Sequence, residues 1–398
     1  MNQSAVIELV FVNTPQILAE AVEAIRGSPV IGFDTEFVGE TTYEPQLCLI
    51  QIATQEGIFV IDPLVGLDLS EFWEAMTAPG REVVALAARQ ELLFCLRYAG
   101  RLPGIVFDPQ VTAGLVGYAY PLSHTNLVQR VLNARIDGGE AYTDWRQRPL
   151  ARRQVEYAAD DVRYLLALRA SLIAKAEALG RVDWLRSECQ RLAERVVESE
   201  REERWSRISG ASSLGRRDLA VLREVWRWRD NTARAADIPP RRILGDDLMV
   251  AIAKRSPKSV GDLLALRGMD RAALRKAGPD IAAAVQVGLK LPDAELPETL
   301  RRDDPPQVAL LAQLASILSN SLALENQVHA ALLATSSDLQ DFVRWRLGLT
   351  EDATSPLLEG WRGEILGRPL MELLEGRMAV RVADMRSASP LRIEPIAD

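Results

Sequence analysis

The chain has 398 residues, 47 Lys and Arg against 55 Asp and Glu, and only two histidines, His124 and His329. Two histidines are too few for most histidine-containing catalytic triads and histidine metal clusters. If the protein is an enzyme, its catalytic residues must therefore be carboxylates, Tyr, Lys or Arg. The three cysteines are far apart and form no Cys-x-x-Cys pair, which argues against a disulfide framework or a zinc site and agrees with a reducing cytoplasm.

The segment that begins at Met1 has no basic region, and no apolar run approaches about 18 residues, so we expect neither export nor insertion into a membrane. The charge is unevenly distributed. The net charge is −7 for residues 1–182, −1 for 183–210, +7 for 211–292 and −7 for 293–398. A basic segment inside an acidic chain indicates a nucleic-acid partner more specifically than the total of −8 does.

A strand is expected over residues 5–12, followed by a helix that Thr14 and Pro15 open. The next expected strand, over residues 30–37, places Asp34 and Glu36 on the same side because side chains two apart in a strand point the same way. Two like charges on a buried strand repel unless a cation neutralises them, and Mg²⁺ or Mn²⁺ suits such oxygen ligands. An Asp-x-Glu triple also occurs about once by chance in a chain of this length, so the pattern alone is weak.

Two further β-rich runs, over residues 47–53 and 57–61, are expected to form a meander with the Asp34 strand. A short strand over 82–87 precedes a helix over 89–98 that ends at Gly100. Asp108, which comes just before a proline, is expected to be a helix N-cap, and His124 a surface or capping residue.

Residues 152–165 have the apolar spacing of a helix. Tyr157 and Asp161 share an otherwise apolar face, whereas Asp160 falls on a polar face with Arg163 and is expected to be solvated. Asp161 needs a partner, which is either a metal ion or an Arg or Lys from elsewhere in the chain.

Residues 183–208 have the composition of a solvated connector helix, and residues 211–292 that of several short helices. Trp226 and Trp228 are expected to be core residues rather than base-stacking platforms. A Pro-rich linker around residues 291–306 leads to a further acidic helical segment without any catalytic pattern. The basic residues expected to contact nucleic acid are Arg227, Arg229, Arg241, Arg242, Lys254, Arg255 and Lys258.

Taken together, these segments resemble the ribonuclease D family of 3'-to-5' exoribonucleases, whose site carries four acidic residues in three motifs, in its tyrosine-bearing branch. Residues 211–292 resemble the HRDC domain, a helical nucleic-acid-binding module, and residues from 305 to about 385 resemble a more divergent second copy. The motifs that carry the resemblance are Phe33-Asp-Thr-Glu-Phe37 with Tyr43-Glu-Pro-Gln-Leu-Cys-Leu-Ile-Gln-Ile52, Thr143-Asp-Trp145 with Pro149-Leu150, Gln154-Val-Glu-Tyr-Ala-Ala-Asp-Asp-Val162, and Leu358-Glu-Gly-Trp-Arg-Gly363.

The resemblance implies an α/β ribonuclease H-like exonuclease domain, with a mixed central sheet flanked by helices, followed by all-α HRDC-type domains. The domain boundaries expected on this basis are 1–182 for the exonuclease domain, 183–210 for a helical connector, 211–292 for a basic HRDC domain, 293–304 for a linker, and 305–398 for a second HRDC-like domain with a C-terminal tail.

The resemblance also implies that Asp34, Glu36, Glu91 and Asp161 bind two divalent metal ions, Mg²⁺ or Mn²⁺, and that Tyr157 orients or deprotonates the attacking water. The implied reaction is two-metal phosphodiester hydrolysis at RNA 3' ends, with tRNA precursors as the family's usual substrates and no membrane involved. A cytoplasmic location is expected.

The second motif departs from the family pattern. Leu86 stands where the family has a histidine, and Glu91 stands where it has its third acidic residue, an aspartate. The segment from Ile136 to Glu140 also lacks a lysine that the family often carries there. A catalytically impaired RNA-binding protein with a nuclease fold therefore stays open as the alternative. Glu91 could also be an ordinary solvated residue paired with Arg89 or Arg97.

Overall fold

The computed structural model describes residues 8–136, 143–350 and 355–396. The chain divides into two compact units. The first contains the segment up to Glu36, Cys48–Glu198 and the chain from Asp304 onward, and the second contains Phe37–Leu47 and Ser199–Asp303.

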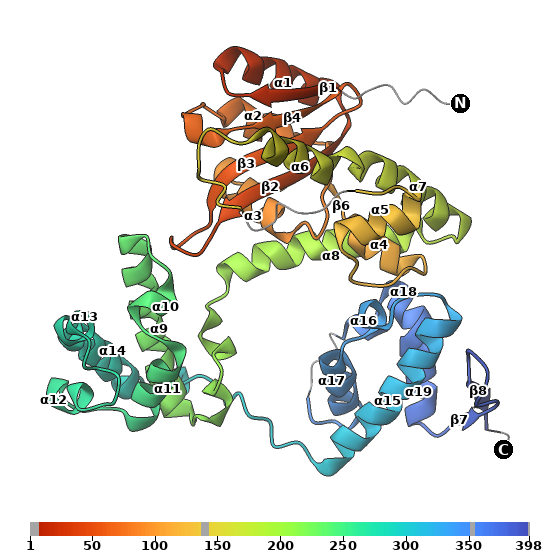
Figure 1. Cartoon of the computed structure of the whole chain (residues 1–398). Helices are drawn as coiled ribbons and strands as arrows, with labels where there is room; N and C mark the ends of the chain where they lie inside the picture. The colour runs from red at the N-terminus through yellow and green to blue at the C-terminus, as the bar shows by residue number, and fades with distance from the viewer. Residues whose placement is uncertain (1–7, 137–142, 351–354, 397–398) are drawn as a thin grey trace. The chain divides into compact units, whose positions relative to one another are not determined.

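The first unit is built on a six-stranded mixed sheet in the order β1-β4-β3-β2-β5-β6 (Figure 1). β1 is parallel to β4, β3 is antiparallel to β4, and β5 is parallel to both β2 and β6. The consecutive strands β2, β3 and β4 are neighbours, which confirms the expected meander. The strands are β1 (Glu8–Val12), β2 (Val30–Val38), β3 (Gln46–Ala53), β4 (Gly57–Ile61), β5 (Glu82–Val84) and β6 (Ile105–Phe107).

Two helical layers cover the faces of this sheet. On one face, Phe33 of β2 contacts Trp73 of α2 (Ser70–Met76), with ring centroids 6.3 Å apart. The adjacent Gly32 points the other way, and a Cβ atom there would lie 3.2 Å from the Cβ of Leu165 in α7 (Leu165–Ala178). Glycine therefore lets α7 approach the sheet closely. Because side chains alternate along a strand, Asp34 faces the α7 side and Thr35 faces the α2 side.

The caps expected from the sequence are present. Thr14 caps α1 (Pro15–Gly27), and Asp108 caps α4 (Pro109–Leu115) through the amides of Gln110 and Val111. α3 (Arg89–Ala99) ends at Gly100, which has the left-handed conformation that favours glycine. The prediction of a single helix over residues 152–165 is wrong about where the helix ends. The structure has two helices, α6 (Arg152–Arg163) and α7, which meet at Tyr164.

α8 (Val182–Arg201) is not the solvated connector that its composition suggests. Glu188 on this helix is buried, and its carboxylate accepts a 3.0 Å hydrogen bond from Trp361 Nε1 and a 2.7 Å bond from Arg362 Nη2. Trp184 stacks on Trp361 with ring centroids 5.0 Å apart. The C-terminal helices thus pack on α8, and a buried glutamate is stabilised by a cation and an indole from far along the chain.

The C-terminal part of the first unit also contacts α4, because the His329 amide donates to the Gly114 carbonyl at 2.9 Å. One of its helices, α15 (Pro306–Glu325), is long and apolar enough to cross a membrane by length and composition alone, a test that core helices of soluble proteins also pass. α15 is interrupted by polar residues and packs against the helices around it. The remaining elements are α16 (Ala330–Leu333), α17 (Ser336–Arg346), a 3₁₀ turn at Pro356–Leu358, α18 (Gly360–Arg362), a π turn at Gly363–Gly367, α19 (Arg368–Leu374), β7 (Met378–Val382) and β8 (Leu391–Pro395).

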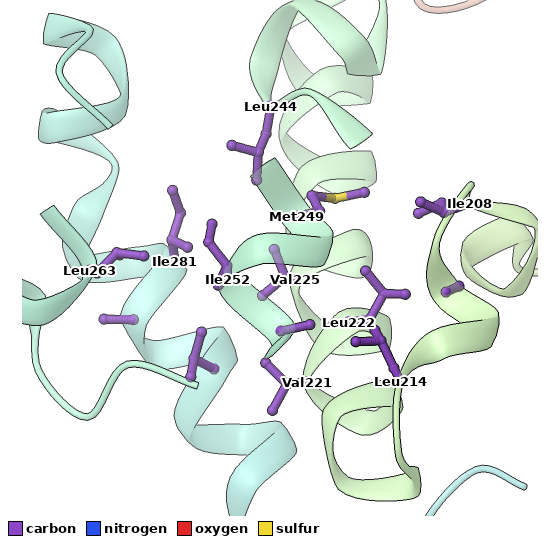
Figure 2. Packing of buried hydrophobic residues seen from close by; sticks show 14 of the residues in the cluster. Ile208, Leu214, Val221, Leu222, Val225, Leu244, Met249, Ile252, Leu263 and Ile281 are labelled. Carbon is purple, nitrogen blue, oxygen red and sulfur yellow. The ribbon is translucent and has the colours of Figure 1, made fainter. Parts of the chain in front are cut away.

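The second unit is a helical bundle whose apolar core is shown in Figure 2. The long helix α9 (Arg216–Ala236) supplies Leu222 and Val225 to this core. Trp226 and Trp228 are partly buried against it, so their expected core role is confirmed. The other helices are α10 (Pro240–Ile243), α11 (Asp246–Arg255), α12 (Val260–Leu264), α13 (Ala272–Lys276) and α14 (Gly278–Lys290).

The loop that follows β2 belongs to the second unit. The Tyr43 hydroxyl donates to Asp230 at 2.8 Å and accepts from Arg234 at 3.0 Å, and the Tyr43 amide donates to Asp237 at 3.1 Å. Burial and the neighbouring Asp230 carboxylate raise the pKa of Tyr43 to about 12. This tyrosine therefore remains a neutral hydrogen-bonding group in the physiological range.

Candidate active site

The two carboxylates of β2 lie on the face of the sheet that α6 and α7 cover. Burial raises the pKa of Asp34 well above its usual range, and the charges of Glu91, Asp161 and Glu36 add to this effect. Burial, followed by the charges of Asp161 and Glu91, raises the pKa of Glu36 to about 8. Four acidic residues from three distant segments thus come within electrostatic range of one another, as expected for a site that a cation neutralises.

The helix α6 contributes Asp161 to this group. Its side chain is 19% exposed, and its Oδ1 lies 3.5 Å from Nδ1 of His124. The neighbouring Asp160 instead forms a 2.6 Å hydrogen bond with Arg163 at the edge of the helix. The sequence-based distinction between these two aspartates is therefore confirmed in their placement.

His124 is not the surface or capping residue that we expected. Ser123 provides the cap of α5 (His124–Leu132), and the His124 side chain is only 14% exposed. Its contact with Asp161 was not predictable from local patterns, since the two residues are on different helices and far apart in the chain.

Glu91 lies near the other three carboxylates but on the opposite side of β2. Its side chain is 5% exposed, and its Oε1 accepts a 2.9 Å hydrogen bond from the Thr35 hydroxyl. Burial is the main cause that raises the pKa of Glu91 to about 7, while the Thr35 bond lowers it. The interpretation of Glu91 as a solvated residue paired with Arg89 or Arg97 is therefore wrong. Thr35 is a site contact that sequence reasoning missed.

A tight turn positions the helix that carries Glu91. Ala87 has a φ of 52°, an uncommon left-handed conformation for alanine, just before α3 begins. The next amide, that of Ala88, donates to Oδ2 of Asp108 at 3.2 Å. The buried Asp108 therefore does more than cap α4, because it also fixes the turn from which Glu91 projects.

Tyr157 lies one helical turn before Asp161, so both project from the same face of α6. Its ring centroid is 6.2 Å from that of Trp145, which is buried. Trp145 belongs to the segment Thr143-Asp-Trp145 that carries the family resemblance, and its ring packs beside that of Tyr157.

The chemistry of these donors suits a hard divalent cation, since carboxylate oxygens are the preferred ligands of Mg²⁺ and Mn²⁺. Within the described residues, no three His, Cys, Asp or Glu side chains are already gathered closely enough to hold one ion. The carboxylates therefore share an electrostatic environment without forming a closed coordination shell. Of the segment from Ile136 to Glu140, where the family often carries a lysine, residues 137–140 lie outside the described part of the chain.

The seven basic residues that the sequence predicts to contact nucleic acid differ in how exposed their side chains are. Arg229 is buried and donates to Asp246 at 2.6 Å and to the Leu244 carbonyl at 3.0 Å, so it stabilises the fold of the bundle rather than an exposed contact. Arg227 forms ion pairs with Glu203 and Glu224. The exposed members of the set are Arg241, Arg242, Lys254, Arg255 and Lys258.

The chain is similar to known proteins over nearly its whole length. A family model described as 3'-5' exonuclease matches residues 9–177, and the HRDC domain model matches residues 218–285. Ribonuclease D of Gluconacetobacter diazotrophicus is 35% identical over 95% of both chains, and ribonuclease D of Nitrobacter hamburgensis is 33% identical over 93% of this chain and 96% of its own length. The crystal structure of Escherichia coli RNase D, an exoribonuclease involved in structured RNA processing, superposes with a TM-score of 0.82 at 30% identity, over 93% of this chain and 99% of that one.

Proposed function

Because this chain belongs to the ribonuclease D family and is a 3'-5' exoribonuclease, we propose that Asp34, Glu36, Glu91 and Asp161 form its metal-binding catalytic site. The supporting observation is that the charges of the other three carboxylates all act on Asp34, although the four residues come from three separate segments. The expected family and fold class are confirmed by the same comparisons.

We propose that the site takes two Mg²⁺ or Mn²⁺ ions. When bound, they supply charge neutralisation for the four carboxylates and Lewis-acid stabilisation of the phosphodiester under attack. The residues have distinct tasks. Asp34 and Glu36 on the rigid strand β2 fix the position of the site, and Asp161 closes it from α6. Tyr157, beside Asp161, orients or deprotonates the water that attacks the terminal phosphodiester.

Glu91 takes the place of the aspartate of the second motif. Its side chain is one methylene longer, and Thr35 holds its carboxylate. We propose that Glu91 is a functional but imperfect ligand, so the enzyme is active and favours Mn²⁺, since Mg²⁺ tolerates departures from octahedral geometry poorly.

We propose that the substrates are the 3' ends of structured RNA, tRNA precursors among them, and that the protein acts in the cytoplasm. The HRDC region contributes to RNA binding through its exposed basic residues, because a segment with a net charge of +7 releases counterions when it docks on phosphates. The domain boundaries given above, including an HRDC-like domain over 305–398, remain part of this proposal.

A single incubation tests the proposed function. The full-length protein is mixed with a structured RNA labelled at its 3' end, in Mg²⁺, in Mn²⁺ or in a chelator. Metal-dependent release of labelled nucleoside 5'-monophosphate is expected. The second candidate function is RNA binding by a catalytically impaired nuclease, and the replacements at Leu86 and Glu91 favour it. RNA that is bound tightly but stays intact in all three conditions would support this candidate instead.

A further inference from the structure

The imidazole of His124 lies against one of the proposed metal ligands. Ser123 caps α5 by accepting a bond from the Asn126 amide at 3.4 Å, so His124 is the first residue of the helix. Its Nδ1 lies 3.5 Å from Oδ1 of Asp161, at the limit of hydrogen-bond distance, and both side chains are largely buried.

The second ring nitrogen determines which tautomer suits this position. Within the described residues, Nε2 of His124 is buried and has no protein hydrogen-bond partner. A neutral imidazole carries one N–H donor and one acceptor, and an orphaned buried N–H is disfavoured. The proton therefore belongs on Nδ1, where it can be donated to Asp161, and the lone pair belongs on Nε2.

We propose that His124 is a positioning residue whose Nδ1–H orients the Asp161 carboxylate toward Asp34 and Glu36. The inference rests on the proposed function, in which Asp161 binds a metal ion. A neutral donor suits this task better than Arg or Lys, because it fixes the carboxylate without cancelling the negative charge that attracts the cation. Hydrogen bonds to metal ligands of this kind commonly change metal affinity by about 10- to 100-fold.

Two amide substitutions separate the role of each nitrogen. In His124→Asn the side-chain NH₂ occupies the position of Nδ1 and can still donate to Asp161, whereas in His124→Gln the NH₂ reaches the position of Nε2. We would measure Mn²⁺ binding by calorimetry, without RNA, for the full-length wild type, His124→Asn, His124→Gln and His124→Leu. His329→Gln is the matched control, because it changes the other histidine of the chain, at the cap of α16.

The expected result is Mn²⁺ affinity near wild type for His124→Asn and for the control, and a loss of about 10- to 100-fold for His124→Gln and His124→Leu. Metal-free melting temperatures near that of the wild type show that each variant folds. Wild-type affinity in His124→Leu, or equal affinities in the Asn and Gln variants, would overturn the inference.

The variant Asp161→Asn distinguishes a failure of the positioning role of His124 from a failure of the proposed metal site. If Asp161→Asn weakens Mn²⁺ binding and the His124 variants do not, only the positioning role fails. If Asp161→Asn itself binds Mn²⁺ like the wild type, the proposed metal site fails. In the Asp161→Asn background, His124→Gln should cause little further loss, because the carboxylate that it orients is gone.

Discussion

The substitution Glu91→Asp restores the family's residue at the one acidic position that departs from its pattern. It shortens the side chain by one methylene, or about 1.5 Å. The bond between Thr35 and Glu91, now 2.9 Å long, would then extend to about 4.4 Å, beyond hydrogen-bond range. Without the bond to Thr35, the carboxylate of the shortened side chain can turn toward the proposed metal ion and coordinate it.

Because about 1 Å of misplacement in a catalytic site can reduce the rate about a hundredfold, Glu91→Asp is expected to raise the Mg²⁺-supported rate by up to about that factor. The gain in Mn²⁺ should be smaller, since Mn²⁺ tolerates the longer ligand better. Glu91→Gln keeps the shape of the side chain, removes its charge and should abolish activity with both metals.

Single-turnover cleavage of 3'-labelled RNA in each metal measures these rates. Thr35→Val provides a further check, because it removes the hydroxyl that holds Glu91 and keeps the volume. It should change the rate in the wild-type background and have little effect in the Glu91→Asp background, where the bond is already lost. Equal rates for wild type, Glu91→Asp and Glu91→Gln would refute the reasoning, and an absence of activity in all three would favour the impaired nuclease.

Three other results are expected. Burial raises the pKa of Glu91 to about 7 from an ordinary 4.5, so the folded state binds more protons. Glu91 alone should therefore lower the metal-free free energy of unfolding by about 3 kcal/mol as pH rises from about 4.5 to above about 7, in addition to the fall that the raised pKa values of Asp34 and Glu36 cause. Urea unfolding should show a smaller fall in Glu91→Gln than in the wild type, and a smaller fall in the wild type with excess metal; a flat metal-free profile in the wild type contradicts the prediction. Tyr157→Phe should reduce the cleavage rate about 10²- to 10⁴-fold, and an unchanged rate would mean that the ring only packs. Replacing Lys254, Arg255 and Lys258 together by alanine should lower the slope of log binding constant against log salt concentration for RNA by about 2. The control replaces the exposed Arg186, Arg201 and Arg386 by alanine and should leave this slope unchanged. Equal slopes for the two triple variants would exclude the exposed basic residues of the HRDC region as the RNA-binding surface.

Local patterns predicted the parts of the site that lie on one element. Strand alternation placed Asp34 and Glu36 on one side, and helix periodicity separated Asp161, which lies beside His124, from Asp160, which is more exposed and pairs with Arg163. The cap at Asp108 was also predictable, because capping depends on residues two and three positions away.

Contacts between distant segments were not predictable in this way. The burial of Glu91 depends on Thr35, 56 residues earlier, and that of Glu188 on Trp361, 173 residues later. Neither partner changes the local pattern around the glutamate, so the pattern predicted a solvated Glu188 and left a solvated Glu91 open as the alternative to a metal ligand. His124 was misjudged for the same reason, since its partner Asp161 lies on another helix.

The central claim is that the four carboxylates bind the ions that catalysis requires. Calorimetric titration of Mn²⁺ into the full-length wild type and Asp34→Asn, with cleavage of 3'-labelled RNA measured on the same samples, tests it most directly. We expect the wild type to bind two ions and release nucleotides from the 3' end, and Asp34→Asn to stay folded while it loses both metal affinity and cleavage. Metal binding and cleavage at wild-type levels in Asp34→Asn would contradict the claim.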